Sequence, residues 1–368
     1  MPHPPELPLD QILTGDALTI LPQLPSASVD LVFADPPYNL QLSGELFRPN
    51  MTRVQGVEED WDRFRSFGDY DDFSRAWLTQ AQRLLKDSGS LWVIGTYHNI
   101  FRLGTILQDL GFWILNDIIW IKSNPMPNFR GVRFTNAHET LIWAARSRHS
   151  RYTFHHHALK ALNDDLQMRS DWTLPTCTGR ERLRYQGEKA HPTQKPEALL
   201  YRVLMASTNP GDVILDPFFG TGTTGVVARQ LGRHWIGVER ESAYVTLAAQ
   251  RLAKTESRHA EDPALRSERG RRGDPRLPVG RLLEAGLLAP GQVLYFERDR
   301  ALAAMLRADG HLQRGTESGS IHQLGRSLAG GSPCNGWEHW FFERTDGTLG
   351  PLDELRKELR RRDSDPQD

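Results

Sequence analysis

The sequence predicts an α/β fold, in which a mostly parallel sheet is covered by helices on both faces and a small α+β domain follows. Short apolar runs alternate with amphipathic stretches over roughly the first 255 residues, as in chains whose strands and helices alternate. A segment rich in Arg, Glu, Asp, Pro and Gly then has almost nothing to bury, which is typical of a linker. We therefore expect a main domain at 1–255, a linker at 256–276 and a C-terminal domain at 277–368.

The first predicted strand of interest is the apolar run from Val29 to Ala34, which stops at the turn Asp35-Pro36-Pro37. Residues 71–86 place their apolar side chains on one helical stripe, and Gly89 ends that helix. Further elements are expected as a strand at 90–94, a helix before Gly111, and strands near 114–121 and 140–144.

A second set of elements begins where Pro196 opens a helix that Asn209-Pro210-Gly211 closes. It continues with a strand at 213–216, a helix at 223–231, a strand at 234–238 and a helix at 242–252. Residues 146–190 interrupt the alternation, because they hold many basic residues and few apolar runs. We interpret them as a surface excursion that takes part in target recognition.

The C-terminal domain is predicted from two strand-like runs, 293–297 and 340–343, and from the hairpin-turn pairs Asp309-Gly310 and Asp346-Gly347. A charged helix is expected near 352–361.

Composition sets limits on the class of protein. The 368 residues are 39% hydrophobic and 25% charged, which is typical of globular domains. Two cysteines without a ligand pattern favour a reducing cytoplasm, and we expect neither a signal peptide nor a membrane span. The net charge of −1 neither indicates nor excludes nucleic acid as a partner. We expect no metal, because the three consecutive histidines at 155–157 cannot converge on one ion in regular structure.

The first candidate site is the tetrad Asp35-Pro36-Pro37-Tyr38 at the end of a predicted strand, where ligands bind in open α/β sheets. A carboxylate and the Pro36 carbonyl can each accept one hydrogen of an aromatic amine, which favours a tetrahedral, nucleophilic nitrogen. Proline holds its carbonyl rigidly, and Tyr38 offers an aromatic face for an extruded base. The alternative is an ordinary Asp-Pro turn.

The second candidate site is a glycine loop that joins the strand ending at Asp216 to a helix, with Phe218, Gly220, Gly222, Thr223 and Gly225 in between. Such a loop lets backbone N–H groups approach a ligand, and Glu239 at the next strand end can bind ribose hydroxyls. The three glycines also fit the G-x-G-x-x-G fingerprint of nicotinamide enzymes. Asp216 favours S-adenosylmethionine, because an acid suits its ammonium group and would repel a pyrophosphate.

Two weaker segments belong to the same set. Thr193 and Lys195, where a helix begins, could bind a carboxylate. Asp16, beside Ala17, could accept an adenine amine. By themselves they are equally typical of a capped helix start.

Together the tetrad, the loop and His191-Pro192-Thr193-Gln194-Lys195-Pro196 resemble the β-class amino-methyltransferases of DNA, in which the tetrad precedes the cofactor loop. The resemblance is closest to the cell-cycle-regulated adenine methyltransferases. It is carried by DPPYNLQL (35–42), WVIGTYHNIFR (92–102), SNPMPNF (123–129), QMRSDW (167–172) and PCNGW (333–337).

The resemblance implies a Rossmann-like methyltransferase fold with a circularly permuted motif order, acting on adenine N6 in GANTC of double-stranded DNA. It implies that Asp35, Pro36, Pro37 and Tyr38 are catalytic. It further implies that S-adenosylmethionine is surrounded by Asp16, Ala17, Thr193, Lys195, Asp216, Phe218, Gly220, Gly222, Thr223 and Glu239. A homodimer, a role in the cell cycle and in DNA replication, and a nucleoid-associated cytoplasmic location in a bacterium are also implied.

DNA contacts are expected from clustered arginines and from the C-terminal domain, since the chain is not basic overall. The candidates are Arg130, Arg133, Arg146, Arg148, Arg151, Arg169, Ser320, Asn335 and Trp337. Three other readings stay open: N4-cytosine methylation, a DNA-binding regulator without activity, and a nicotinamide enzyme.

Overall fold

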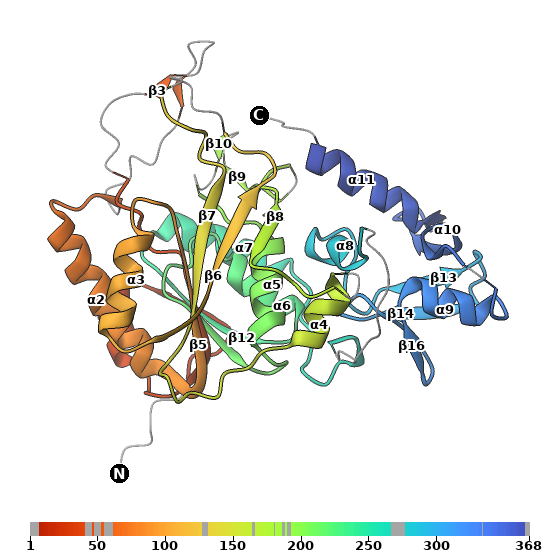
Figure 1. The fold of residues 1–368 in the computed structure, drawn as a ribbon, viewed down its shortest axis with the longest axis horizontal. Helices are drawn as coiled ribbons and strands as arrows, with labels where there is room; N and C mark the ends of the chain where they lie inside the picture. Colours follow the sequence, from red (N-terminus) through yellow and green to blue (C-terminus); the bar gives the residue numbers. More distant parts are fainter. Residues whose placement is uncertain are drawn as a thin grey trace.

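The computed structural model describes residues 7–40, 46–47, 53–54, 62–126, 132–163, 166–179, 181–185, 188–189, 193–265, 277–332 and 334–364. Within them an eight-stranded sheet forms the centre of the N-terminal unit (Figure 1). Its strands, in order across the sheet, are β1 (Gln11–Thr14), β12 (His234–Glu239), β11 (Val213–Asp216), β2 (Val29–Ala34), β5 (Leu85–Gly95), β7 (His138–Ala145), β6 (Trp113–Lys122) and β8 (Asp171–Leu174).

The mostly parallel sheet predicted from the sequence is confirmed. From β1 to β5 each neighbouring pair is parallel. β7 runs antiparallel to both β5 and β6, and β8 is parallel to β6. Consequently the carboxyl ends of β2, β5, β11 and β12 lie along one side of the sheet, where β7 begins. The term edge refers below to this side, formed by strand ends, or to the side opposite it.

Helices cover both faces of this sheet. Successive strand residues point to opposite faces, and because both faces carry apolar side chains, both must be covered. One face packs against α1 (Ala17–Ile20), the short 3-10 helix η1 (Leu21–Gln23), α2 (Phe67–Leu84) and α3 (Ile100–Asp109). The other face packs against α4 (His156–Leu162), α5 (Glu197–Ser207), α6 (Thr223–Gln230) and α7 (Ser242–Ala253). Two small antiparallel ribbons pair β3 (Leu46–Phe47) with β4 (Arg53–Val54) and β9 (Arg184–Tyr185) with β10 (Glu188–Lys189). No helix among the described residues is long and apolar enough to span a membrane.

Two local expectations need correction. The helix expected at 71–86 begins four residues earlier, because the Ser66 hydroxyl caps it by accepting the Asp69 N–H. It ends at Leu84, and the strand β5 begins at once. Residues 146–190 are not wholly a surface excursion: α4 buries Ala158, Leu159 and Leu162, and β8 is the edge strand of the central sheet.

The C-terminal unit holds a six-stranded antiparallel sheet within the described residues. Its strands, in order, are β16 (Glu317–Gly319), β15 (Leu312–Arg314), β14 (Ala303–Leu306), β13 (Val293–Phe296), β17 (Trp340–Glu343) and β18 (Leu349–Pro351). Its helices are α8 (Gly280–Glu284), α9 (Ile321–Leu328), α10 (Gly336–His339) and α11 (Leu352–Ser364), with the 3-10 helix η3 (Pro263–Leu265) preceding them. The predicted turns at Gly310 and Gly347 join antiparallel strands, each with a φ near +80° that favours glycine.

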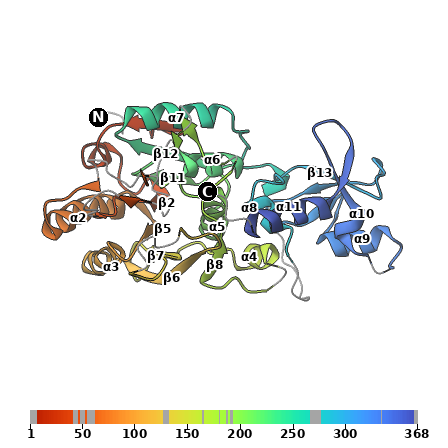
Figure 2. The same cartoon turned by 90° about the horizontal axis from the view of Figure 1, so that it is seen from above.

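The two units share one continuous core, with α8 at their boundary (Figure 2). Arg202 of α5 donates two hydrogen bonds of 2.9 Å to Glu284 of α8, and both side chains are buried. Beside them, Tyr201 Oη donates to the Ala308 carbonyl oxygen at 2.7 Å. The C-terminal unit is therefore packed against the main sheet unit rather than tethered to it.

Candidate active site

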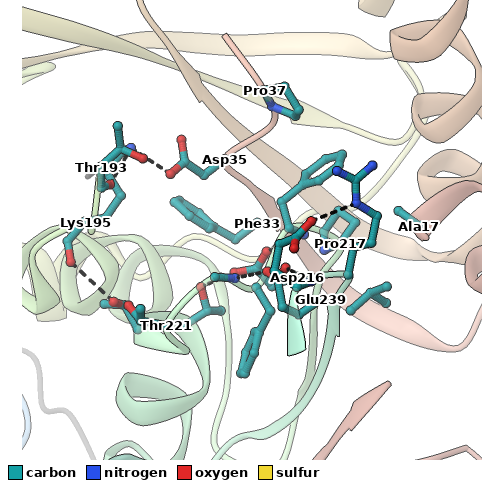
Figure 3. Close-up of a pocket in the computed structure, with 18 of the residues that line it drawn as sticks. Ala17, Phe33, Asp35, Pro37, Thr193, Lys195, Asp216, Pro217, Thr221 and Glu239 are labelled. Atoms are coloured by element: carbon teal, nitrogen blue, oxygen red, sulfur yellow. Dashed lines mark hydrogen bonds and ion pairs between the residues drawn. The ribbon is translucent and has the colours of Figure 1, made fainter. Parts of the chain in front are cut away.

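The tetrad and the glycine loop meet at one cavity of about 290 Å³, which Asp35 and Pro37 line but Pro36 and Tyr38 do not. They meet because β2, which carries Asp35 at its end, lies beside β11, which ends at Asp216. In Figure 3, Asp35 and Thr193 lie on one side of the cavity, Ala17 lies on the opposite side, and Asp216 and Glu239 lie between them. A parallel sheet thus brings together two motifs that are about 180 residues apart in sequence.

The tetrad loop is held from below by the buried carboxylate of Asp62. It accepts the backbone N–H groups of Tyr38, Asn39 and Leu40 at 2.5, 2.8 and 3.0 Å. Asn39 has a φ of +52°, a left-handed conformation that asparagine tolerates. These contacts fix the direction in which the chain leaves β2.

A second anchor holds the Pro37 carbonyl oxygen, which accepts the hydroxyl of buried Tyr70 at 3.0 Å. The Asn99 amide supports it by donating to the Tyr70 oxygen at 3.1 Å. Among the described residues, no group donates to the Pro36 carbonyl. The carbonyl that the sequence predicts as an amine acceptor is therefore available.

Asp35 lies in a chain of charged groups. Its Oδ2 accepts Lys195 Nζ at 2.6 Å, and its Oδ1 accepts the Tyr38 hydroxyl at 2.9 Å. The same hydroxyl lies 3.0 Å from Glu139 Oε2, and the other Glu139 oxygen pairs with Lys122 Nζ at 2.8 Å. The Lys195 ammonium also lies 5.1 Å from the centre of the Tyr38 ring, so it covers one ring face.

These contacts shift the pKa values of Asp35, Glu139 and Tyr38. Burial raises the pKa of Asp35, although the Lys195 ammonium opposes this. Burial alone would raise the pKa of Glu139, but the charges of Lys195 and Lys122 hold it below its usual value. The pKa of Tyr38 lies well above its usual value because of burial and the two carboxylates, so the phenol stays a neutral donor.

Two carboxylates, those of Glu239 and Asp216, accept hydrogen bonds from the glycine loop. Glu239 accepts the N–H groups of Gly220 and Glu241 at 2.7 and 2.8 Å, one on each oxygen. Asp216, which is only 3% exposed, accepts the Phe218 N–H at 3.0 Å and the Thr224 hydroxyl at 2.6 Å. Burial raises the pKa of Asp216 to about 7.

Most residues predicted around the cofactor line this cavity: Asp16, Ala17, Thr193, Lys195, Asp216, Phe218, Gly220, Thr223 and Glu239. Gly222 does not line it. Gly222 has a φ of +78° at the start of α6, and a Cβ there would lie 3.0 Å from the Ala248 side chain. Its role is thus to let the loop turn. Asp16 also caps α1 by accepting the Leu18 N–H at 2.8 Å.

The lining suits a cationic ligand with hydroxyl groups. Asp16, Asp216 and Glu239 all face the cavity, and no described Lys or Arg forms an ion pair with any of the three. Asp216 is the buried one of the three. A buried carboxylate without a cation is costly, and a bound ammonium or sulfonium would reduce that cost. Each oxygen of Glu239 keeps a free lone pair for a ribose hydroxyl. No cluster of side chains suited to a metal is present among the described residues.

The predicted DNA-contacting arginines are spread over both edges of the sheet. Arg130 lies outside the described residues. Arg133 is exposed and precedes β7, at the edge where Asp35 lies. Arg169 is exposed and forms two hydrogen bonds of 2.8 Å with Asp171. Arg146 follows β7 and pairs with Asp87 at the opposite edge, away from the cavity.

The three residues singled out in the C-terminal unit have roles within its fold. Ser320 caps α9 in a capping box with Gln323, and Asn335 precedes α10 and donates to Glu338. Trp337 is 1% exposed and packs under the Arg356 guanidinium. Their contact with DNA stays a prediction.

Three functional-site residues were missed in the sequence: Asp62, Lys122 and Glu139. Asp62 lies 24 residues beyond Tyr38, and Glu139 lies 101 residues beyond it. No spacing rule links such positions. The available signal was a charged residue at one end of an apolar run: Lys122 is the last residue of β6, and Glu139 precedes the apolar part of β7.

Comparison with known proteins gives matches along nearly the whole chain. Residues 29–250 match the family described as DNA methylase, and residues 259–365 match the family described as Restriction Enzyme Adenine Methylase Associated. The type II methyltransferase M.HinfI of Haemophilus influenzae is 44% identical over 351 residues, which are 95% of this chain and 96% of that protein. The type II methyltransferase M2.LlaDCHI of Lactococcus lactis subsp. cremoris is 41% identical over 244 residues, 66% of this chain and 89% of that protein.

Solved structures share the fold of the N-terminal unit. The M1.HpyAVI–SAM complex is 26% identical with a TM-score of 0.50, covering 66% of this chain and 98% of that one. The PvuII cytosine-N4-specific DNA methyltransferase is 22% identical with a TM-score of 0.52, covering 66% and 85%.

Proposed function

This chain belongs to the family of DNA methylases, and from that premise we propose that it transfers a methyl group from S-adenosylmethionine to N6 of adenine in double-stranded DNA. The observation that carries the proposal is the single cavity that Asp35 shares with Asp216 and Glu239. An amine held at Asp35 and a methyl donor held by the glycine loop would meet there. Proximity of this kind supplies a large part of a rate enhancement.

The residues of the chain divide into two groups in this proposal. Asp216 and Asp16 would hold the cationic and adenine ends of S-adenosylmethionine, and Glu239 would hold its ribose. When bound, S-adenosylmethionine supplies an activated methyl group. Asp35 and the free carbonyl of Pro36 would each accept one hydrogen of the target amine, so that the nitrogen lone pair is directed at the methyl. Pro37 and Tyr38 would position these two acceptors.

The choice of adenine over cytosine rests on Asp35 at the first tetrad position and on resemblance to the cell-cycle-regulated methyltransferases. The same resemblance supports GANTC as the recognised sequence and extrusion of the base into the site. The M1.HpyAVI–SAM complex supports the cofactor. The PvuII enzyme shares only the fold, so it does not favour cytosine.

Product analysis tests the proposal. The protein is incubated with labelled S-adenosylmethionine and two duplexes that differ only in having GANTC or a scrambled site. We expect labelled N6-methyladenine in the first duplex alone. N4-methylcytosine would reject adenine as the target, and label in neither duplex nor in genomic DNA would reject the enzyme.

A separate ligand test concerns the cavity. We expect S-adenosylmethionine, and not NAD, to raise the thermal midpoint, because only a ligand of the folded state stabilises it. Protection by NAD alone would restore the nicotinamide reading.

The C-terminal unit, homodimer formation and a cell-cycle role complete the proposal. The match to a methylase-associated family supports a DNA-binding task for residues 277–364. Dimer formation and cell-cycle timing rest on resemblance.

A further inference from the structure

We propose that Glu139 is a positioning residue that releases Asp35 for the substrate: it offers the Tyr38 hydroxyl an alternative acceptor when an amine arrives. This inference rests on the proposed function, because it concerns the amine that Asp35 would receive. It adds a residue that lies outside the cavity lining and outside the tetrad.

The Tyr38 hydroxyl has one hydrogen and two carboxylate neighbours. A phenol has a single O–H, yet Tyr38 Oη lies 2.9 Å from Asp35 Oδ1 and 3.0 Å from Glu139 Oε2. It can donate fully to only one of the two carboxylates at a time. With Lys195 on Asp35 Oδ2 at 2.6 Å, a hydroxyl directed at Oδ1 takes one acceptor position of that oxygen and competes with any further donor for its charge.

Glu139 can relieve this competition, because its carboxylate is held in place as a second acceptor for the Tyr38 hydroxyl. It is 8% exposed, and Lys122 Nζ holds its other oxygen at 2.8 Å. Rotation of the hydroxyl toward Glu139 costs no hydrogen bond, since one contact replaces the other at nearly equal distance. Asp35 Oδ1 then has no competing donor and accepts an N6 hydrogen more strongly, while Oδ2 stays with Lys195.

The charges of the site allow the switch without net change. Lys122 and Lys195 balance Glu139 and Asp35, and only the direction of the phenol O–H differs between the two states. Glu139 Oε2 also lies 3.9 Å from Lys195 Nζ, and this weaker ion pair does not depend on the Tyr38 hydroxyl. The inference therefore predicts that most of the effect of Glu139 is lost when Tyr38 lacks its hydroxyl.

A double-mutant cycle tests this. The paired change Lys122→Met with Glu139→Met removes acceptor and counter-ion together, so neither buried charge is left alone. It is compared in the wild-type and Tyr38→Phe backgrounds by single-turnover methylation with saturating DNA and S-adenosylmethionine. We expect a rate loss of at least about tenfold in the wild-type background and less than about threefold with Tyr38→Phe.

Folding is checked by the affinity for S-adenosylmethionine, because none of Lys122, Glu139 and Tyr38 lines its cavity. If the paired variant loses that affinity, the same cycle is run with Lys122→Leu and Glu139→Leu, which again removes the acceptor and its counter-ion together. Equal rate losses in both backgrounds, or no loss in the wild-type background, would overturn the inference. A wild-type protein that forms no N6-methyladenine would instead reject the proposed function.

Discussion

Asp216 is the residue whose ionisation should control ligand binding. Burial raises its pKa to about 7, so the carboxyl is about half protonated at neutral pH in the ligand-free protein. A cationic ligand needs the carboxylate form, and below pH 7 it must displace a proton to obtain it. We expect the Kd for S-adenosylmethionine to rise by up to about tenfold per pH unit as pH falls below 7.

Calorimetry between pH 6 and 8 measures this slope. Asp216→Asn should weaken binding and flatten the profile. Glu181→Gln is the matched control, because burial likewise raises the pKa of Glu181 to about 7 but this residue does not line the cavity. An Asp216→Asn profile as steep as that of the wild type would assign the titration to another group.

Asp35 should affect the chemical step rather than ligand binding. Asp35→Asn keeps the size of the side chain but replaces one acceptor oxygen with a donor, which faces either Lys195 or the amine. We expect turnover to fall at least tenfold, about 1.4 kcal/mol, with S-adenosylmethionine affinity nearly unchanged. Filter-binding assays with labelled cofactor measure both quantities. Retention of wild-type turnover would remove Asp35 from the mechanism.

The loop between β2 and α2 depends on one carboxylate for its shape. Asp62 accepts three backbone N–H groups, and hydrogen bonds to a charged group contribute about 1.5–3 kcal/mol each. We expect Asp62→Ala to lower single-turnover rates at least tenfold, with Asp62→Asn intermediate because Oδ1 alone serves two of the three donors.

Asp69→Ala is the control for that series, since Asp69 forms only an exposed pair with Arg65 in the same region. Asp62→Ala with the turnover of the control would mean that the tetrad loop holds its conformation without this anchor.

These loops also show which features were predictable. The apolar run Val29–Ala34 was expected as a strand and is β2, because five of its six residues are apolar and buried. A strand was likewise expected near 114–121 and is β6, yet its first residue, Trp113, is 46% exposed at the edge away from the site, under the Arg148 guanidinium. Periodicity predicts a strand but not which end of it is covered.

The site network was not predictable for a related reason. Glu139 reaches Tyr38 only because β7 runs antiparallel to β5, so that its first residues lie where β2 ends. The sequence indicated a mostly parallel sheet but not which strand is antiparallel, and a parallel β7 would have placed Glu139 at the opposite edge. Strand direction, set by the whole sheet, decides this contact.

For the molecule as a whole, the positions of its charges matter more than its net charge of −1. Arg133 lies at the edge of the sheet that holds the cavity, whereas Arg146 and Arg148 lie at the other edge, in contact with Asp87 and Trp113. One duplex cannot contact both edges while presenting a base to Asp35. Of these three arginines, only Arg133 is therefore placed to contact a phosphate near the reacting base.

The boundary between the two units rests on a buried ion pair, and this limits how the C-terminal unit can be tested. Arg202 and Glu284 are 6% and 2% exposed. Deletion of the C-terminal unit would leave the Arg202 guanidinium without this partner and uncover the surface that Leu282 and Leu283 cover. A loss of DNA affinity after deletion would then report damage to the main unit as well as a lost contact.

Substitutions at this pair measure that coupling directly. Glu284→Ala should lower the free energy of unfolding by about 3–5 kcal/mol, because it leaves a buried charge unpaired. Arg202→Met combined with Glu284→Met should recover most of the loss, since two apolar side chains of similar size replace both charges. The control is Glu343→Ala, which breaks an exposed pair with Arg300 and should cost less than about 1 kcal/mol. Urea unfolding measures all three. If Glu284→Ala were no more damaging than Glu343→Ala, the buried pair would not couple the two units, and their coupling would rest on the shared apolar core alone.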